Sequence, residues 1–336
     1  TPSHELGQLF RALQAVGPAV GQNHAPGARL LALEPEPLPD DARGIPVLQN
    51  QWIDARFRQG IPQTESIALA AGKTTEVLRI APNSVPRGLN LNPFSSSAVR
   101  AAAISAAFLL QRILADRLDI DPEEIEVANL EKKTLSNREE VANIILSDRL
   151  PNGAGFVRQG HDEFLEILNE ACHPMIAGSY SKIIQDDNHR NGPRPCGSAC
   201  YDCLKVYRNM TYHGLLDWRL AISYLRMLRN PDYKAGLDGN FNSPELEGWV
   251  ETATKHRDSF ISYFNRYEPV MWGRLPGFKA GSRKFIIVHP LWNTQNPSGI
   301  LADAVANAGG NVDGYIDTFN LLRRPGWCRQ EIARNS

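Results

Sequence analysis

Apolar residues recur at intervals of three and four positions after the serines at 95–97, which predicts a long helix with one buried face. The serine hydroxyls can accept hydrogen bonds from the first backbone amides and so favour a helix start there. Alanine is frequent along the segment and allows close packing, so we expect a core helix that lies against a sheet. Its apolar stripe consists of Val99, Ala103, Ala106, Leu110 and Ile113.

Strand patterns occur on both sides of this helix. Residues 141–146 are apolar except for Asn143, which is typical of a strand covered on both faces. Shorter alternating segments predict strands within 74–80 and 125–130. Near the C-terminus, the apolar run 284–288 predicts another buried strand.

Helical periodicity follows most of these strands. We expect helices over 161–171, 244–257 and 298–308, and a further helix after Cys203. The helix over 298–308, together with the strand before it and a short strand over 312–316, predicts a second α/β unit. The stripe of the helix after Cys203 consists of Leu216, Leu220, Tyr224 and Leu228.

These patterns predict an α/β fold of the mixed α+β kind. It comprises a mixed sheet with packed helices, a metal-binding loop that leads into a helix, and a smaller C-terminal α/β unit. Proline- and acid-rich sequence at 34–41 cannot hold a helix or a ladder and indicates an exposed connector. We therefore expect an N-terminal connector with short helices over 1–70, a central domain over 71–230 and a C-terminal subdomain over 231–336.

The charge balance removes some classes of function. The 336 residues contain 36 Lys and Arg against 37 Asp and Glu, a formal net charge of −1, so the chain is not a polybasic protein that coats nucleic acid. The most apolar run, 101–110, is too short to span a bilayer. No signal peptide follows Thr1, so we expect a cytoplasmic protein without a membrane partner.

Three of the five cysteines, Cys196, Cys200 and Cys203, lie within eight residues. A Cys-x3-Cys-x2-Cys run brings three thiolates round one tight loop, which suits a tetrahedral zinc ion. Without a metal, these residues would be buried thiols that act as small hydrophobes. A disulfide framework is less consistent with the odd number of cysteines. We expect a structural rather than a catalytic zinc, because the loop leads directly into a helix and shows no opening for a catalytic water.

The sequence offers three candidates for the fourth zinc ligand. His189 lies seven residues before Cys196 in a polar loop, and its imidazole would complete a set of three thiolates and one histidine. Cys172 would complete an all-cysteine set, although it ends a helical segment. His213 is a further candidate if the loop doubles back. We favour His189.

Two weaker signals concern catalysis. The strand over 141–146 leads to Asp148 and a glycine-rich turn at 152–155, a layout that resembles a phosphate-binding loop but lacks the Gly-Lys-Ser/Thr of a Walker motif. A tight strand-to-helix turn explains the glycines equally well. His289 follows the strand over 284–288, a position where active-site residues gather in open α/β sheets. A histidine whose hydrogen bonds are made within the turn after the strand is the simpler interpretation.

Basic residues concentrate around the metal loop. We predict phosphate contact there, with a solvated face balanced by Asp186, Asp187 and Asp202 as an equal alternative. Near the C-terminus, Arg323 and Arg324 could contact phosphates or be solvated. The residues expected to bind nucleic acid are Arg190, Arg194, Lys205 and Arg208, with Arg219 in the same cluster.

Three segments in this order resemble a known family. They are Leu146-Ser-Asp148-x3-Asn152-Gly-Ala-Gly155-Phe156, Cys196-x3-Cys200-Tyr-Asp-Cys203-Leu-x2-Tyr207-x-Asn209 and His213-Gly-Leu-Leu-Asp217-Trp218-Arg219-Leu220. They look like the zinc-binding C-terminal domain of MrfA-type helicases, which DrmB-like proteins of DISARM phage-defence systems also carry. The likeness covers about residues 74–230, and the chain departs from the family in having Asn152 where glycine is common.

The resemblance implies an accessory module of a DNA-processing machine. Members work beside, or are joined to, a superfamily 2 helicase, and no Walker A or DEAD/DEAH-type sequence occurs in this chain. We therefore expect no catalysis in this chain, a structural zinc, a helicase partner in cis or in trans, and contact with DNA. Two alternatives are a nuclease that uses His289 with Asp148 or Asp217, and a pure protein–protein adaptor. The residues expected to support the zinc ligands are Asn209, His213, Asp217 and Arg219.

Overall fold

The computed structural model describes residues 74–172 and 196–334. The chain divides into two compact units, residues 1–76 with 150–154, and residues 77–149 with 155–336. The predicted connector over 1–70 lies outside the described residues, and the boundary expected at 230 stays a prediction. In the described part of the first unit, the Thr75 hydroxyl donates to the Leu150 carbonyl at 3.0 Å, and the Asn152 amide donates to the Thr74 carbonyl at 2.7 Å.

The first sheet of the larger unit is built around β4 (Glu140–Asp148). One edge of β4 pairs with β1 (Val77–Ile80), and the other edge pairs with β2 (Ile125–Val127) and β3 (Glu131–Thr134), all antiparallel. Every residue of β4 after Glu140 is buried, which confirms the buried strand expected over 141–146. The strand expected over 125–130 is shorter, and β3 was not predicted.

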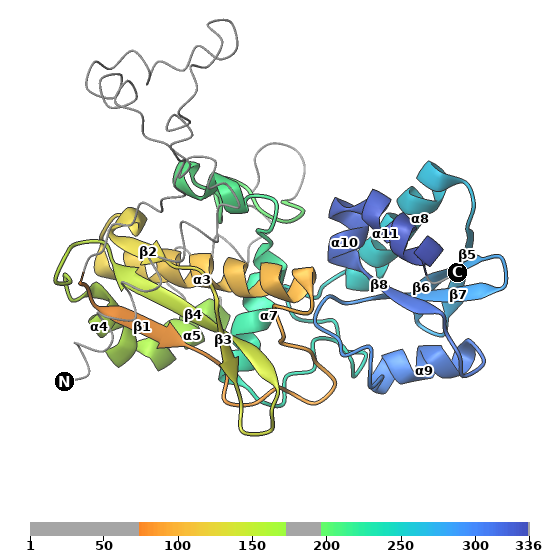
Figure 1. Ribbon diagram of the computed structural model, residues 1–336, viewed down its shortest axis with the longest axis horizontal. Coiled ribbons are helices and arrows are strands. Elements are labelled where there is room, and N and C mark those ends of the chain that lie inside the picture. Colours follow the sequence, from red (N-terminus) through yellow and green to blue (C-terminus); the bar gives the residue numbers. More distant parts are fainter. Residues whose placement is uncertain (1–73, 173–195, 335–336) are drawn as a thin grey trace, which may run out of the picture. The chain divides into compact units, whose positions relative to one another are not determined.

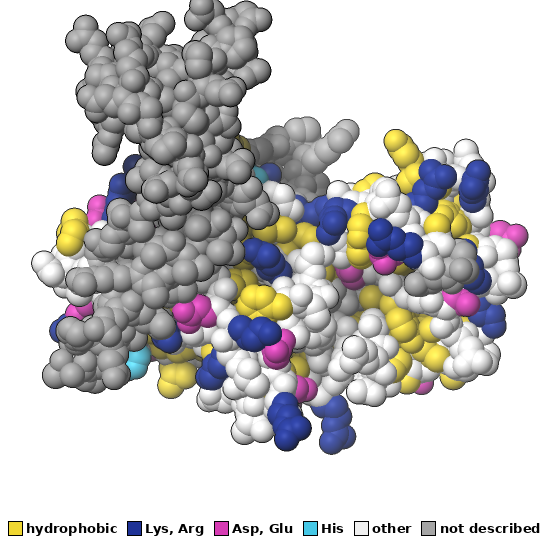
Figure 2. All heavy atoms as spheres, viewed as in Figure 1, with side chains coloured by type: hydrophobic (Ala, Val, Ile, Leu, Met, Phe, Trp, Pro, Cys, Tyr) yellow, Lys and Arg dark blue, Asp and Glu magenta, His cyan; other side chains and the backbone are white. Residues whose placement is uncertain are grey.

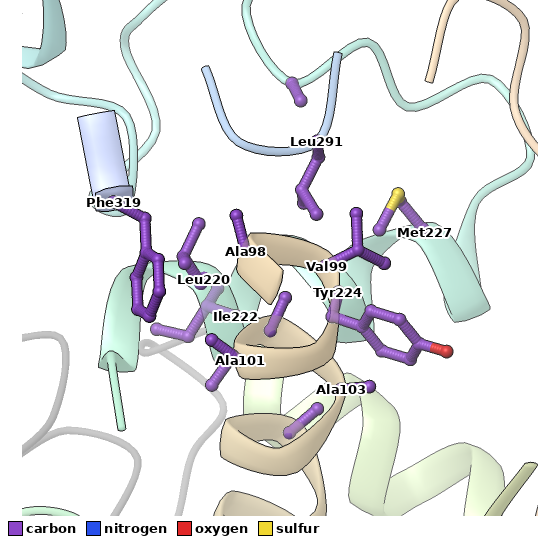
Figure 3. Close-up of a cluster of buried hydrophobic side chains, with 14 of the residues drawn as sticks. Ala98, Val99, Ala101, Ala103, Leu220, Ile222, Tyr224, Met227, Leu291 and Phe319 are labelled. Atoms are coloured by element: carbon purple, nitrogen blue, oxygen red, sulfur yellow. The ribbon is translucent and has the colours of Figure 1, made fainter. Parts of the chain in front are cut away.

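The predicted core helix is α3 (Ser97–Leu118), whose N-cap Ser96 accepts a hydrogen bond from the Val99 amide at 3.3 Å. It packs against β4 and β2 and also against α7 (Trp218–Arg229). Figure 3 shows the close approach that the small side chains allow, with Ala98 and Ala101 of α3 near Leu220 and Ile222 of α7.

By length and composition α3 could cross a membrane, but 83% of its apolar window is buried inside the protein. It is therefore the core helix of this unit.

Two predicted helices have different bounds. The segment expected over 161–171 is split into α4 (Phe156–Asp162) and α5 (Phe164–Cys172), with Glu163 between them. Arg117 of α3 binds Glu163, Glu166 and Glu170 at 2.5–3.1 Å, so the carboxylates at and after the break converge on one guanidinium.

The helix expected over 244–257 is α8 (Trp249–Phe264). The residues before it form turns, in which Glu245 is buried and pairs with Arg226 at 2.7 Å. That ion pair accounts for the later start, because it holds the preceding segment against α7.

A second sheet has the order β5–β6–β7–β8. The strands β5 (Glu268–Trp272), β6 (Leu275–Ala280) and β7 (Arg283–Val288) form an antiparallel meander, and β8 (Gly314–Asp317) is parallel to β7. The helix α9 (Gly299–Asn307) connects β7 to β8, which confirms the predicted strand–helix–strand unit.

Helices cover this second sheet. Figure 1 shows α9 on one face and α8, α10 (Thr318–Arg323) and α11 (Pro325–Arg334) on the other. With β5 and β6, the helices α10 and α11 were not predicted. Two sheets with packed helices make the mixed α+β class correct.

Candidate metal centre

The cysteine loop brings its three sulfur atoms together. The Sγ atoms of Cys196, Cys200 and Cys203 all lie within 4.8 Å of one another. The chain turns because the amides of Cys203 and Lys205 both donate to the Cys200 carbonyl, at 3.3 and 2.9 Å. The Cys200 amide in turn donates to the Cys203 sulfur at 3.1 Å, a contact that favours the thiolate form.

The sulfur spacing fits zinc. The Cys200 and Cys203 sulfurs are 3.7 Å apart. A tetrahedral site with Zn–S bonds of about 2.3 Å separates its sulfurs by about 3.8 Å. Cys200 and Cys203 therefore already have the spacing of zinc ligands, and Cys196 lies within 4.8 Å of both.

The electrostatics of the loop favour a cation in it. A hydrogen bond with Cys196, followed by burial, raises the pKa of the Cys203 thiol far above its usual range. Burial raises the pKa of Cys200 as well, and the nearby Cys196 adds to that effect. Three crowded sulfurs cannot all become thiolates unless a positive charge compensates them, and a zinc ion would supply that charge.

The N-terminus of α7 anchors the loop. The Trp218 amide donates to the Ser198 carbonyl at 2.8 Å, and its indole Nε1 donates to the Cys196 carbonyl at 3.3 Å. Arg219 donates to the same carbonyl at 3.3 Å while its guanidinium lies 4.2 Å from the centre of the Trp218 ring. The first cysteine is therefore held by two side chains of α7.

Asn209 and His213 hold the segment that follows the cysteines. The buried Asn209 side chain accepts from the Val206 amide and donates to the Leu204 carbonyl, both at 2.9 Å. Nε2 of His213 lies 3.0 Å from the Val206 carbonyl and 2.9 Å from Asn209 Oδ1. Both oxygens are acceptors, so Nε2 carries the proton. These contacts fix the short 3-10 helix η5 (Tyr207–Tyr212) against the loop.

Asp217 caps α7 and accepts from the amides of Arg219 and Leu220 at 3.1 and 3.3 Å. Its own amide donates to the Ser105 hydroxyl of α3 at 2.9 Å, and that hydroxyl donates to the Leu215 carbonyl at 3.3 Å. Burial raises the pKa of Asp217 to about 6, while Arg323 opposes that shift. Asp217 thus joins the start of α7 to the core helix.

Arg323 of α10 is a supporting residue that the sequence did not identify as one. Its guanidinium donates to the carbonyls of Gly214 and Leu216 at 2.6 and 2.8 Å, and it lies 3.8 Å from the Asp217 carboxylate. It therefore holds the turn before α7 instead of meeting phosphates. No local pattern could have revealed this role, because the two partners are 109 and 107 residues away in sequence.

The fourth ligand stays a prediction. His189 lies outside the described residues. Among the described residues no fourth His, Cys, Asp or Glu joins the three clustered sulfurs, so neither Cys172 nor His213 does. Burial raises the pKa of the Cys172 thiol to about 11, and its charged neighbours are Arg226, Arg229 and Glu245.

The expected phosphate-binding cluster is only partly described. Arg190 and Arg194 lie outside the described residues. Lys205 is half-buried, and Arg208 is 58% exposed but pairs with Glu123 at 2.7 Å. Exposed aromatic side chains lie on the same segment, with Tyr201 61% and Tyr207 82% exposed.

The turn after β4 is a helix cap. The Asp148 carboxylate accepts from the amides of Gly155 and Val157 at 2.8 and 3.0 Å and so caps the start of α4. Asn152 has φ = 69°, in the left-handed region that glycine adopts freely and asparagine tolerates best among the other residues. The strand-to-helix interpretation therefore accounts for the turn.

His289 lies at the end of β7 beside a cavity of about 590 Å³, where it is only 3% exposed. Its Nδ1 accepts from the Leu291 amide at 3.3 Å, and burial lowers its pKa to about 3. Asp148 and Asp217 do not line that cavity, and each accepts two backbone amides. This arrangement offers no support for a nuclease that pairs either carboxylate with His289.

The loop and its anchors define a thiolate zinc-binding module joined to a helix. Residues 106–204, less than a third of the chain, match the MrfA Zn-binding domain. The matched segment begins within α3 and includes all three clustered cysteines. The family and the cysteine cluster together support a structural zinc ion. No curated protein and no solved structure matches the chain.

Proposed function

We propose that this chain is a non-catalytic accessory module that acts on DNA beside a superfamily 2 helicase, with its zinc loop as a structural centre. The observation that carries the proposal is the set of three sulfurs within 4.8 Å inside a MrfA-type zinc-binding domain. The loop is tied to α7 by backbone and side-chain hydrogen bonds, so the metal would fix one end of that helix.

In this proposal, Cys196, Cys200 and Cys203 bind the zinc, and His189 completes the set. The zinc supplies the positive charge that three thiolates require. The protein supplies orientation, because Trp218 and Arg219 hold the Cys196 carbonyl and Asn209 holds the segment after Cys203. A closed set of four protein ligands leaves no position for a catalytic water.

The helicase and DNA parts of the proposal draw on the family resemblance. MrfA-type helicases and DrmB-like proteins of DISARM systems carry a domain of this kind, which favours anti-phage defence or DNA repair in the cytoplasm. The motor would lie in the same polypeptide or in a partner. The exposed segment with Tyr201, Tyr207 and Arg208 is the surface that the zinc loop offers to DNA.

Metal analysis of the purified chain tests the zinc centre. We expect about one zinc per chain, lost together with cooperative unfolding in Cys200→Ser. Cys328→Ser is the matched control, because Cys328 is a buried thiol outside the cluster, and it should keep the metal. A parent protein that folds stably without metal would overturn the proposal.

Cobalt substitution distinguishes the candidates for the fourth ligand. Co²⁺ in a thiolate site gives sulfur charge-transfer bands whose intensity rises with the number of thiolates. His189→Cys should strengthen these bands, and His189→Ala should weaken metal affinity while Cys172→Ser leaves it unchanged. The opposite result would assign Cys172 as the ligand.

Binding assays with DNA and with a superfamily 2 helicase test the remaining part. We expect DNA affinity to fall with rising salt, because phosphate contacts release counterions. We also expect the chain to bind the helicase and alter its DNA-stimulated ATPase rate. Helicase binding without any DNA affinity would identify a protein–protein adaptor instead.

A further inference from the structure

A second group of basic residues lies far along the chain from the zinc loop, directly after α8, directly before α11 and on α11. Arg266, Arg324 and Arg329 are all exposed. Among the described residues, no carboxylate lies within ion-pair distance of any of the three. Figure 2 shows dark blue side chains gathered over the region that carries α8, α10 and α11.

Aromatic rings hold two of these arginines in place. The Arg324 guanidinium lies 4.9 Å from the centre of the Trp327 ring, and the Arg329 guanidinium lies 5.1 Å from the centre of the Phe264 ring. A guanidinium that rests on a ring loses little side-chain entropy when it binds a phosphate, and its N–H groups remain free at the edge. These arginines are therefore prepared to meet an anion.

An exposed ring lies beside this pair. Tyr263 is 79% exposed, and its ring centre is 5.0 Å from that of Phe264 at an interplanar angle of 77°. Its faces are thus open to solvent next to the Arg329–Phe264 stack. An exposed, fixed aromatic face can stack on an unpaired base.

Few acidic groups oppose this positive charge. Between 324 and 334 the only acidic residue is Glu331, and it pairs with Arg334 at 2.8 Å. Between 259 and 270 the only one is Glu268. Together, these two segments therefore carry more basic than acidic residues, while Asp317 and Glu331 line a small cavity together with Trp327.

One member of each arginine stack, Trp327 in the first and Arg329 in the second, belongs to α11. Trp327 and Arg329 are two positions apart, so their side chains leave the helix about 200° apart. The distance across a helix with its side chains is about 10–12 Å. A strand that crosses α11 would thus meet both stacks.

We propose that this arginine–aromatic surface, made of Tyr263, Arg266, Arg324, Trp327 and Arg329, binds single-stranded nucleic acid. The three guanidinium groups bind phosphates, and Tyr263 stacks on a base. The inference rests on the proposed function in requiring a nucleic-acid role, and it assigns the contact to a surface outside the zinc loop. A duplex would satisfy the arginines but would leave the Tyr263 face without a partner, because paired bases are already stacked.

The test is fluorescence anisotropy of the whole zinc-loaded chain with labelled oligothymidine and with a duplex of equal length. Charge reversal in Arg324→Glu/Arg329→Glu should weaken single-strand binding by at least about tenfold. Tyr263→Ala should weaken it by about tenfold while duplex binding stays within about twofold. Circular dichroism checks that each variant folds. Arg324→Gln/Arg329→Gln removes the two positive charges without reversing them and should weaken single-strand binding less than the charge reversal does.

Arg334→Glu is the matched control for Arg329→Glu, because Arg334 is an exposed arginine on the same helix that already pairs with Glu331. We expect the control to bind nearly as well as the parent. Equal losses in Arg334→Glu and Arg329→Glu would show that only the general charge matters, and displacement of the oligonucleotide by polyglutamate at equal charge concentration would show the same. Either result overturns the proposal.

A second pair of variants separates this inference from the proposed function. If Lys205→Glu/Arg208→Glu abolishes binding and the α11 variants bind as the parent does, the zinc-loop contact stands and this inference fails. A parent that binds no nucleic acid would overturn both. Loss in the α11 and Tyr263 variants alone supports this inference and removes the zinc loop as the DNA contact.

Discussion

The zinc-loop segment and the region around α11 both present exposed arginines near aromatic rings, but the arginines differ in their partners. Arg208 follows the cysteine loop and pairs with Glu123 at 2.7 Å. Arg324 and Arg329 lie on aromatic rings, without a carboxylate partner among the described residues. A paired arginine must give up its partner before it binds a phosphate, whereas a stacked one keeps its ring contact. Local charge in a sequence therefore does not identify the surface that is ready for an anion.

The two regions also hold together by different means. The zinc loop buries Cys203 and Leu204 and is held by hydrogen bonds to α7 and to Asn209, and in our proposal by the metal. The C-terminal region is held by packing, with stacked rings such as Phe278 and Phe285 and a buried stretch Phe285–Val288 in β7. We expect metal removal to destabilise the zinc loop and acid to destabilise the C-terminal region.

The largest expected effect is the loss of the metal through Cys200→Ser. Structural zinc sites contribute roughly 10 kcal/mol or more in small domains, so removal should cost at least several kcal/mol of the free energy of unfolding. Chemical denaturation followed by circular dichroism would report the loss. A variant that unfolds as the parent does would show that the loop is held without metal.

Arg323→Ala should produce the next largest effect, because Arg323 connects α10 to the turn before α7. The change leaves two carbonyls and the half-buried Asp217 carboxylate without their guanidinium partner, which costs about 2–4 kcal/mol. Chemical denaturation of the zinc-loaded chain measures this cost. Arg324→Ala is the control, because Arg324 is the exposed neighbour, and it should cost less than about 0.5 kcal/mol.

How far the sequence predicts the structure depends on the distance over which a residue acts. The buried strand around Ile144, the capped helix α3 and the cysteine loop follow from local patterns, and the structure has all three. The strands β5 and β6 were missed because Pro269 and Gly277 normally break strands. Pro269 is tolerated on the edge strand, and Gly277 is required because a Cβ there would lie 2.4 Å from the Phe285 carbonyl.

In the candidate metal centre, too, local contacts could be predicted from the sequence and distant ones could not. The three cysteines are close in sequence, so their grouping could be predicted from spacing alone. Arg323 reaches the turn before α7 from more than 100 residues away, and only the packing of α10 brings it there. Whether an arginine is paired, as Arg208 is, or stacked, as Arg329 is, also depends on contacts between distant elements.

Acid should weaken the C-terminal region through His289. Its pKa is lowered from 6.5 to about 3 by burial, so the unfolded chain binds a proton that the folded chain does not bind over that range. The stabilising contribution is complete above about pH 6.5 and is lost as the pH falls towards 3, at up to about 1.4 kcal/mol per pH unit. His289→Gln should flatten this slope relative to the parent in denaturation curves between pH 7 and pH 4.5. Parallel slopes in the two proteins would show that His289 titrates normally.

The smallest expected effect concerns the ion pair that distinguishes the two arginine surfaces. Glu123→Gln removes the carboxylate that binds Arg208 and should change the free energy of unfolding by less than about 1 kcal/mol, because the pair is more than one-third exposed on both sides. It should raise DNA affinity by about two- to fivefold at low salt, and screening should remove that gain as salt rises. Glu331→Gln on α11 is the matched control, since it frees Arg334 in the same way. An equal gain in both variants would mean that net charge alone sets the affinity. A gain confined to Glu123→Gln would show that the zinc-loop surface reaches DNA once its arginine is released.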